Sequence, residues 1–168
     1  MKIYAYIDDS NLFIEGQRVS AINKGHAQSI SHSTRSNIMD HSWHINYWRL
    51  FDFVCGRGNE VEVAHIWGSR NSSENFWKMV RDVGFNTSLG TRNQKGKEKQ
   101  VDVAIAHAMT KHAYSGFVDK ENGEMVLVSG DADYVPVVED LVNSGFRVSV
   151  VFWKHAAWEL RQVASEFI

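Results

Sequence analysis

Apolar residues along this chain fall into short continuous runs that alternate with segments of helical period. Short apolar runs bounded by polar or glycine-containing turns are typical of strands buried in a parallel sheet. Longer segments with apolar residues three and four positions apart predict helices that pack on such a sheet. The predicted strands cover Ile3–Ile7, Val61–Trp67, Phe85–Leu89, Met125–Val128, Phe146–Phe152 and the terminal Phe167 and Ile168.

Helices are predicted between these strands. The first begins near Leu12, and the others cover Ile45–Val54, Ser72–Val83, Gln100–Tyr114, a segment ending at Asn143 and a last segment ending at Ala164. This alternation predicts an α/β fold with three layers, in which helices cover both faces of a central parallel sheet. No linker or internal repeat divides the 168 residues, so we expect a single domain over residues 1–168.

The segment Ile22–His44 departs from this pattern, because serine, histidine and asparagine replace apolar residues. It predicts a polar loop or insertion at about residues 22–44, and loops of this length are usually functional or disordered. It contains four of the eight histidines, at spacings that match no zinc motif: His26, His32, His41 and His44. A solvated loop is therefore the favoured interpretation.

Composition restricts the function classes only weakly. The formal net charge of −2 gives no global electrostatic reason to bind nucleic acid or a membrane, so a polyanion site would need a local patch or metal ions. The single cysteine, Cys55, excludes an internal disulfide framework. No signal peptide or bilayer-spanning apolar run is visible, so we expect a cytoplasmic protein without membrane association.

Aspartates stand where two predicted strands end and where one predicted helix begins. Asp8 and Asp9 follow the first strand, Asp131 and Asp133 follow the fourth, and Asp102 lies in the first turn of the intervening helix. Each position alone has a structural explanation, since acids are favoured at helix starts, and Asp133 could cap the next helix. However, ligands of open parallel sheets bind at the carboxyl ends of the strands, where these acids would meet.

A cluster of carboxylates needs a neutralising partner, because the charges raise one another's pKa values. Oxygen ligands suit hard divalent cations, so the cluster would take Mg²⁺ or Mn²⁺. Such an ion lowers the pKa of a bound water and stabilises charge on a phosphoryl group. The reaction class that fits is metal-assisted hydrolysis of a phosphodiester.

Three motifs resemble the NYN domain, a family of the PIN-like ribonuclease superfamily. They are I-D-D-S-N-L from Ile7, K-x-x-D-V-A-I-A from Lys99 and V-S-G-D-A-D-Y-V-P from Val128, in the family's order. The S-G-D-x-D-[FY] element is the most specific, and the resemblance covers nearly the whole chain. It implies a Rossmann-like (PIN-like) fold and a metal-dependent endoribonuclease that acts on RNA, above all on single-stranded RNA.

The resemblance also implies roles for individual residues. Asp8, Asp102, Asp131 and Asp133 match the metal-binding and catalytic acids, and Asn11 matches the asparagine that orients the first acid. The candidate substrate-binding residues flank these positions, and they are Ser10, Ser129, Arg92, Lys95, Lys97 and Lys99. The four basic residues precede Asp102 and would hold phosphates without reading sequence.

Two departures from the family pattern leave alternatives open. The position after the first acid is usually glycine, and it is Asp9 here, so Asp8 and Asp9 compete as the ligand. Many members carry another acid where this chain has Ala108. Its loss allows for one metal ion in place of two, or for a catalytically weak or inactive domain that binds RNA or protein.

Other contacts are less specific. Trp43, Trp153 and Trp158 could stack on bases, although core packing is their favoured role. PIN-like proteins often dimerise, so the resemblance also points to a homodimer.

Two unrelated classes of protein also carry acids after the first strand. A phosphoacceptor receiver domain needs an acceptor aspartate at the end of a buried strand, whereas Asp52 lies in an amphipathic segment. A phosphatase of the haloacid dehalogenase type needs a D-x-D opening, but Ser10 stands at the second acidic position. It also needs a late acid where Val135 stands. Both classes are therefore disfavoured.

Overall fold

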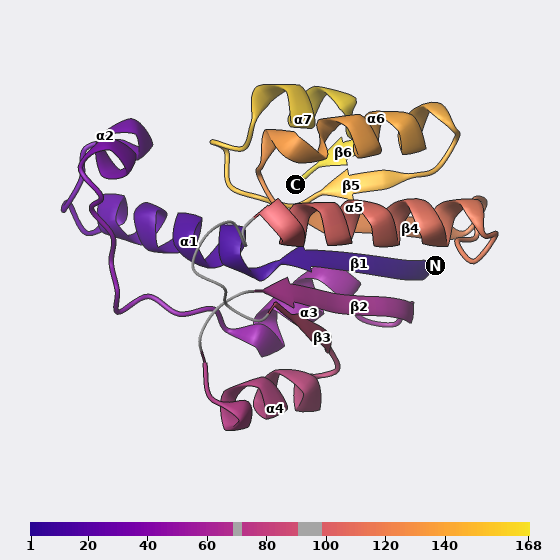
Figure 1. Cartoon of the computed structure of the whole chain (residues 1–168), viewed down its shortest axis with the longest axis horizontal. Helices are drawn as coiled ribbons and strands as arrows, with labels where there is room; N and C mark the ends of the chain where they lie inside the picture. Colours follow the sequence, from indigo (N-terminus) through magenta and orange to yellow (C-terminus); the bar gives the residue numbers. More distant parts are fainter. Residues whose placement is uncertain (69–71, 91–98) are drawn as a thin grey trace.

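The strands form one parallel sheet in the computed structural model, which describes residues 1–68, 72–90 and 99–168 without the side chains of Lys99 and Gln100 (Figure 1). Its strand order is β3-β2-β1-β4-β5-β6, and every neighbouring pair is parallel. The strands are β1 (Lys2–Asp8), β2 (Glu60–Gly68), β3 (Asn86–Leu89), β4 (Gly123–Val128), β5 (Val148–Val150) and β6 (Glu166–Phe167). The predicted parallel sheet is confirmed.

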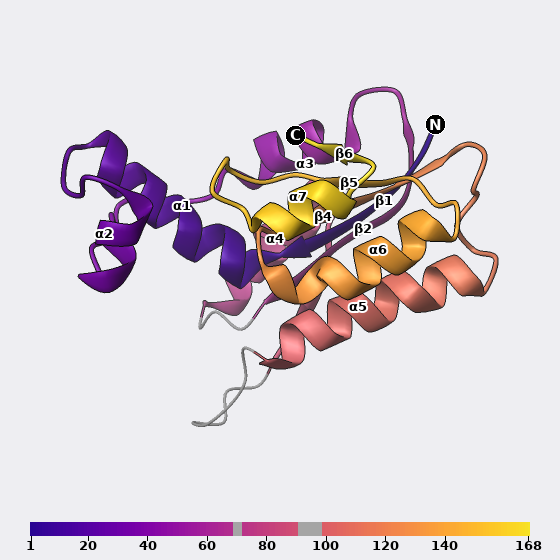
Figure 2. The ribbon, with the colours of Figure 1, turned by 90° about the horizontal axis from the view of Figure 1, so that it is seen from above.

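Helices cover both faces of this sheet, as predicted. One core lies under α1 (Asp9–Asn23), α3 (Tyr47–Cys55) and α4 (Glu74–Val83), and the other under α5 (Lys99–Tyr114), α6 (Val135–Asn143) and α7 (Trp158–Val163). Figure 2 shows α5, α6 and α7 on one side of the sheet and α3 on the other. We call the core under α5, α6 and α7 the α5 core, and the core under α1, α3 and α4 the α3 core. Successive strand side chains alternate, so Tyr4 and Tyr6 of β1 face the α5 core, whereas Ile3, Ala5 and Ile7 face the α3 core.

Local signals in the sequence fix where the helices begin and end. The side chains of Asn46 and Ser73 accept backbone N–H groups at the starts of α3 and α4. Pro136 lies in the first turn of α6, where no backbone donor is needed. The main differences from prediction occur late in the chain, where β5 is shorter than Phe146–Phe152 and α7 begins only at Trp158.

The strand order reverses between β1 and β4, which lie side by side at the centre of the sheet. The chain leaves β1 toward one face and leaves β4 toward the other, so a crevice forms at the carboxyl ends of these two strands. The helix α5 runs antiparallel to the strands, and its first turn therefore reaches the same edge (Figure 1).

The segment 22–44 consists mostly of turns and irregular chain, and the predicted loop is interrupted by one short helix. The helix α1 continues to Asn23 and runs past the edge of the sheet, and α2 (Ile30–Arg35) lies at its outer end (Figures 1 and 2). Asp40 is buried and accepts hydrogen bonds from Ser20 (2.5 Å) and Lys24 (2.8 Å). The segment is held by polar contacts of this kind, which hydrophobic periodicity does not reveal.

We expect replacement of Asp40 by alanine to loosen this segment. Hydrogen bonds from Lys24, Ser20 and Ser42 hold the pKa of Asp40 below its ordinary range. The ionised Asp40 therefore contributes fully to the stability of the fold at neutral pH. This contribution is lost as the pH falls below about 4 toward the lowered pKa. Hydrogen exchange of amides 24–46 at pH 7 should be faster in Asp40→Ala and unchanged in the exposed neighbour His41→Ala; equal rates would contradict this role.

The described part of the chain contains no helix that is both long and apolar enough to cross a bilayer.

Candidate active site

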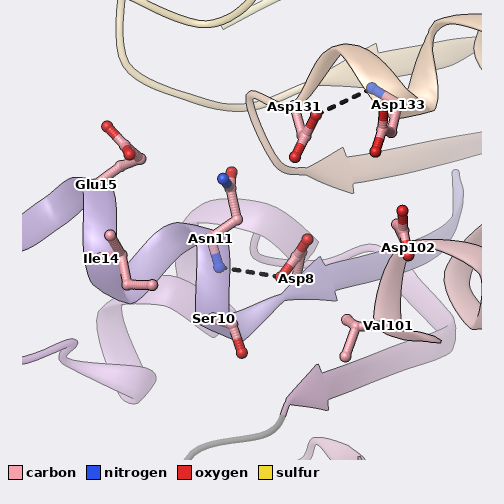
Figure 3. A pocket seen from close by; sticks show the side chains of 9 residues that line it. All are labelled: Asp8, Ser10, Asn11, Ile14, Glu15, Val101, Asp102, Asp131 and Asp133. Atoms are coloured by element: carbon pink, nitrogen blue, oxygen red, sulfur yellow. Dashed lines mark hydrogen bonds between the residues drawn. The ribbon is translucent and has the colours of Figure 1, made fainter. Parts of the chain in front are cut away.

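A cavity of about 310 Å³ opens at the carboxyl ends of β1 and β4 (Figure 3). It is lined by Asp8, Ser10, Asn11, Ile14, Glu15, Val101, Asp102, Asp131 and Asp133. The acids predicted from three separate parts of the chain therefore share one pocket. Asp131 and Asp133 come from the loop after β4, and Asp102 comes from the first turn of α5.

Asp8 is the buried acid of the cavity. It ends β1, is 6% exposed and caps α1 by accepting the backbone N–H of Asn11 at 3.0 Å. Its second carboxylate oxygen accepts the hydroxyl of Tyr134, also at 3.0 Å. Burial raises the pKa of Asp8 to about 6, and the charges of Asp131 and Asp9 add to this effect, while the two hydrogen bonds oppose it. A cation in the cavity would reverse the shift.

Asp9 points to a different environment from Asp8. It is fully buried and accepts a hydrogen bond of 2.5 Å from the hydroxyl of Tyr47, a residue of the α3 core. It does not belong to the cavity lining. The geometry thus favours Asp8 over Asp9 as the acid available to a ligand.

Asp131 and Asp133 occupy a 3₁₀ turn, η1 (Ala132–Tyr134). Asp131 caps this turn by accepting the backbone N–H of Asp133 at 3.0 Å. The next helix, α6, follows Tyr134 and has no side-chain cap, so the expectation that Asp133 caps it was wrong. Both residues are exposed, so their carboxylates lie at the rim of the cavity, unlike that of Asp8.

Asn11 joins the two loops that form the site. Its side-chain oxygen accepts hydrogen bonds from the Ser129 hydroxyl and the Gly130 N–H, both at 3.0 Å. The group of Asn11 that bonds Asp8 is the backbone N–H, whereas the expectation was the side-chain amide. The side chain instead fixes the loop that carries Asp131.

Ser129 does not reach the cavity, and the prediction that it contacts substrate was wrong. It is fully buried, its hydroxyl donates to Asn11, and it accepts the N–H of Asp131 at 3.3 Å. The other predicted serine, Ser10, does line the cavity.

Tyr134 lies close to acids from several parts of the site, and its pKa shows their effect. Its ring is fully buried and its hydroxyl donates to Asp8. Burial raises the pKa of Tyr134 well above its ordinary range, and the charges of Asp8, Asp102 and Asp131 raise it further. Acids from three different segments therefore act on one hydroxyl group. Tyr134 is a residue whose role in the site the sequence did not predict.

Four of the predicted substrate-binding residues have no described side chain. Arg92, Lys95 and Lys97 fall outside the described residues, and Lys99 is described only as the first backbone position of α5. Their contact with RNA stays a prediction. Ala108 packs half-buried against the α5 core and does not line the cavity.

Glu15 lines the cavity but was missed from the sequence. It follows Asn11 by four residues on α1, a spacing that places both on one helix face and could have identified it. It pairs with Arg18 and accepts a hydrogen bond of 2.8 Å from His155. Burial raises the pKa of Glu15, but these partners outweigh burial and hold it below the ordinary range.

The donor set fits a hard divalent cation, because carboxylate and hydroxyl oxygens line one cavity. Among the residues that the structure describes, no three His, Cys, Asp or Glu side chains are placed to ligate one ion together. Magnesium usually keeps several waters and takes one or two carboxylates together with substrate phosphates. Such an ion would be held by one or two of these acids, partly through water.

Comparison with known proteins identifies the family and a solved structure with a similar fold. A model of the NYN domain matches residues 9–168. The crystal structure of a protein of unknown function from Vibrio parahaemolyticus matches with a TM-score of 0.68 and 18% identity, covering 99% of this chain and 91% of that chain. At this identity the match shows a shared fold. No curated protein matches the chain.

Proposed function

The chain belongs to the NYN domain family, and from this premise we propose that it is a metal-dependent endoribonuclease that hydrolyses single-stranded RNA in the cytoplasm. NYN domains are generally nucleases of the PIN-like superfamily, and the family suggests RNA as the ligand. The observation that carries the proposal is the meeting of Asp8, Asp102, Asp131 and Asp133 in one cavity. The homodimer stays a prediction from the family.

The acids of the cavity differ in burial, and we expect them to contact a divalent ion in different ways. Asp8 would hold a divalent ion from the buried end of the cavity, where the field of the ion is least screened. Asp131 or Asp133 would hold it from the exposed rim, directly or through a water molecule. Mg²⁺ or Mn²⁺, when bound, supplies an acidified water and stabilises charge on the phosphoryl oxygens.

The remaining residues would position these acids. Tyr134 and the Asn11 N–H hold both oxygens of Asp8, and Asn11 with Ser129 holds the loop of Asp131. Within the described part of the chain, the carboxylate of Asp133 accepts no hydrogen bond. It is therefore free to accept a hydrogen bond from a water molecule or from the substrate in the cavity.

A second candidate function is RNA or protein binding without cleavage. Ala108 supports this candidate, because many NYN domains carry an acid where this chain has an apolar residue on α5. The binding module would use the same cavity and differ only in lacking turnover.

Cleavage of labelled single-stranded RNA in Mg²⁺ or Mn²⁺ separates the two functions. We expect Asp131→Asn to lower the rate by about tenfold to a hundredfold, since the exposed carboxylate is one of several ion contacts. The matched control is Asp52→Asn, which alters an exposed aspartate on α3 that pairs with Arg57 at the surface. Equal cleavage by wild type and Asp131→Asn would indicate a contaminant and favour the binding module.

A further inference from the structure

Aromatic rings from three distant segments lie together next to α1, and one of them, His155, bonds a residue that lines the cavity. The ring centroids are 6.3 Å apart for Phe13 and Trp43, 6.0 Å for Trp43 and Trp153, and 6.3 Å for Trp153 and His155. The last two rings are within 10° of parallel. We call these four residues the aromatic ledge. All four are half-buried, so each ring is held by neighbours and keeps part of its surface in solvent.

Two hydrogen bonds connect the segment 155–157, which includes His155 of the ledge, to Glu15 in the cavity lining and to Gly130, the neighbour of Asp131. His155 bonds Glu15 of α1, which lines the cavity. The Ala157 N–H donates to the Gly130 carbonyl at 2.9 Å, beside Asp131. The loop between β5 and α7, which carries Trp153 and His155, reaches toward α1 in both views (Figures 1 and 2). A group bound on the ledge would therefore be close to a group bound in the cavity.

Trp43 is held in place by a glycine of α1. A Cβ at Gly16 would lie 2.1 Å from the end of the Trp43 indole, so the indole occupies the space that any other residue would fill. Glycine is unfavourable inside a helix, and this contact explains its presence there. The ring is thus fixed in advance, which lowers the entropy cost of stacking a ligand on it.

Positive groups accompany these rings, although the cavity itself is acidic. Lys154 is exposed between Trp153 and His155. Arg18 pairs with Glu15, and its buried Nε atom has no hydrogen-bond partner in the described structure. Rings with cations beside them are the usual composition of sites for single-stranded nucleic acid. Packing of the core alone would not require a lysine and a histidine here.

We propose that the aromatic ledge stacks an unpaired base of the RNA, next to the phosphodiester that occupies the cavity. This inference rests on the proposed function, because that function supplies RNA as the ligand. Stacking needs a free base face, which a duplex does not offer. The ledge therefore makes single-stranded RNA the preferred substrate.

Binding of fluorescently labelled RNA to the full chain tests this proposal. All titrations are done in a chelator so that the RNA stays intact, with the wild type as the parent protein. Each protein is titrated with a single-stranded oligonucleotide and with a duplex of the same sequence. Trp153→Leu keeps an apolar side chain but removes the stacking face. It should raise the Kd for single-stranded RNA by about fivefold to a hundredfold and leave that for duplex unchanged.

The matched control is Trp158→Leu. Trp158 is 66% exposed on α7 and is not part of the ledge, so this variant should bind as the parent does. Abasic oligonucleotides supply a readout on unchanged protein. Loss of one base should weaken binding to the parent and leave binding to Trp153→Leu unaffected.

Three results would overturn the ledge: an unchanged Kd in Trp153→Leu, an equal loss in Trp158→Leu, or an equal loss for duplex. Binding that depends on the ledge without any cleavage by the wild type would instead reject the nuclease and keep the ledge. Cleavage of RNA by the wild type, together with the same Kd in wild type and Trp153→Leu, would keep the nuclease and reject the ledge. A chain that binds no single-stranded RNA would reject both.

Discussion

Replacement of Asp8 by asparagine is expected to lower RNA cleavage by on the order of a hundredfold to a thousandfold, the loss typical of a buried electrostatic group at a reacting centre. Among the acids that line the cavity, Asp8 is the one most completely removed from water, and its shape is kept by asparagine. Its neutral amide would also lose the charge that attracts a divalent ion. The same variant should be more stable than the wild type at neutral pH without metal.

The expected stability follows from the direction of the pKa shift. The folded protein raises the pKa of Asp8 from 3.8 to about 6, so folding disfavours the ionised form. Below about pH 4 the carboxyl is protonated in both states and contributes no penalty. As the pH rises to about 6, the unfolded chain ionises first and stability falls, by up to about 3 kcal/mol when both states are ionised. Asp8→Asn should remove this loss.

Urea unfolding in a chelator at pH 4 and pH 7 measures this effect. The free energy of unfolding of Asp8→Asn should exceed that of the wild type at pH 7 and match it at pH 4. Added Mg²⁺ should stabilise the wild type at pH 7 and have less effect on the variant, because the ion binds the folded state. Asp52→Asn serves as the control in each assay. If Asp8→Asn raised the free energy of unfolding equally at both pH values, the ionisation of buried Asp8 would not be what destabilises the wild type at pH 7.

Replacement of Gly130 by alanine is expected to damage both the fold and the activity. A Cβ there would lie 2.2 Å from the nearest ring carbon of Phe152. The backbone of Gly130 is also held on both sides, because its N–H donates to Asn11 and its carbonyl accepts from Ala157. We expect a loss of about 1–3 kcal/mol from overpacking. Displacement of Asp131 by about 1 Å would lower cleavage by about a hundredfold.

Thermal unfolding and RNA cleavage together measure the Gly130→Ala effect. For a chain of this size, the midpoint should fall by roughly 2–4 °C per kcal/mol. The matched control is Gly90→Ala, because among the described residues a Cβ at Gly90 meets nothing closer than 3.9 Å. Normal cleavage by a folded Gly130→Ala protein would show that the loop tolerates the shift and that Phe152 yields.

The two glycines of the site illustrate the limit of reasoning from the chain. The glycine of the S-G-D element, Gly130, has no space for a Cβ. The reason is the ring of Phe152, which is far along the sequence. Gly16 likewise looks like a weak point of α1 until Trp43 is placed against it.

The sequence alone determined the α/β class, the position of nearly every helix and strand, and the acids at the strand ends. These features follow from local rules, since hydrophobic period, caps and turns act over a few residues. It did not reveal the short helix within segment 22–44 or the hydrogen bonds of buried Asp40 there. Binary patterns of apolar and polar residues carry no information about which polar groups pair.

Only the tertiary structure decided which of these acids share a cavity and what surrounds them. The separation of Asp8 from Asp9, the burial of Ser129 and the link from Glu15 to His155 all depend on contacts between distant segments. Such contacts arise because the carboxyl ends of parallel strands lie at the same edge of the sheet. The loops after β1 and β4 come together there, at the point where the strand order reverses. The spacing of residues along the chain cannot specify that meeting, because it is set by how the strands are ordered in space.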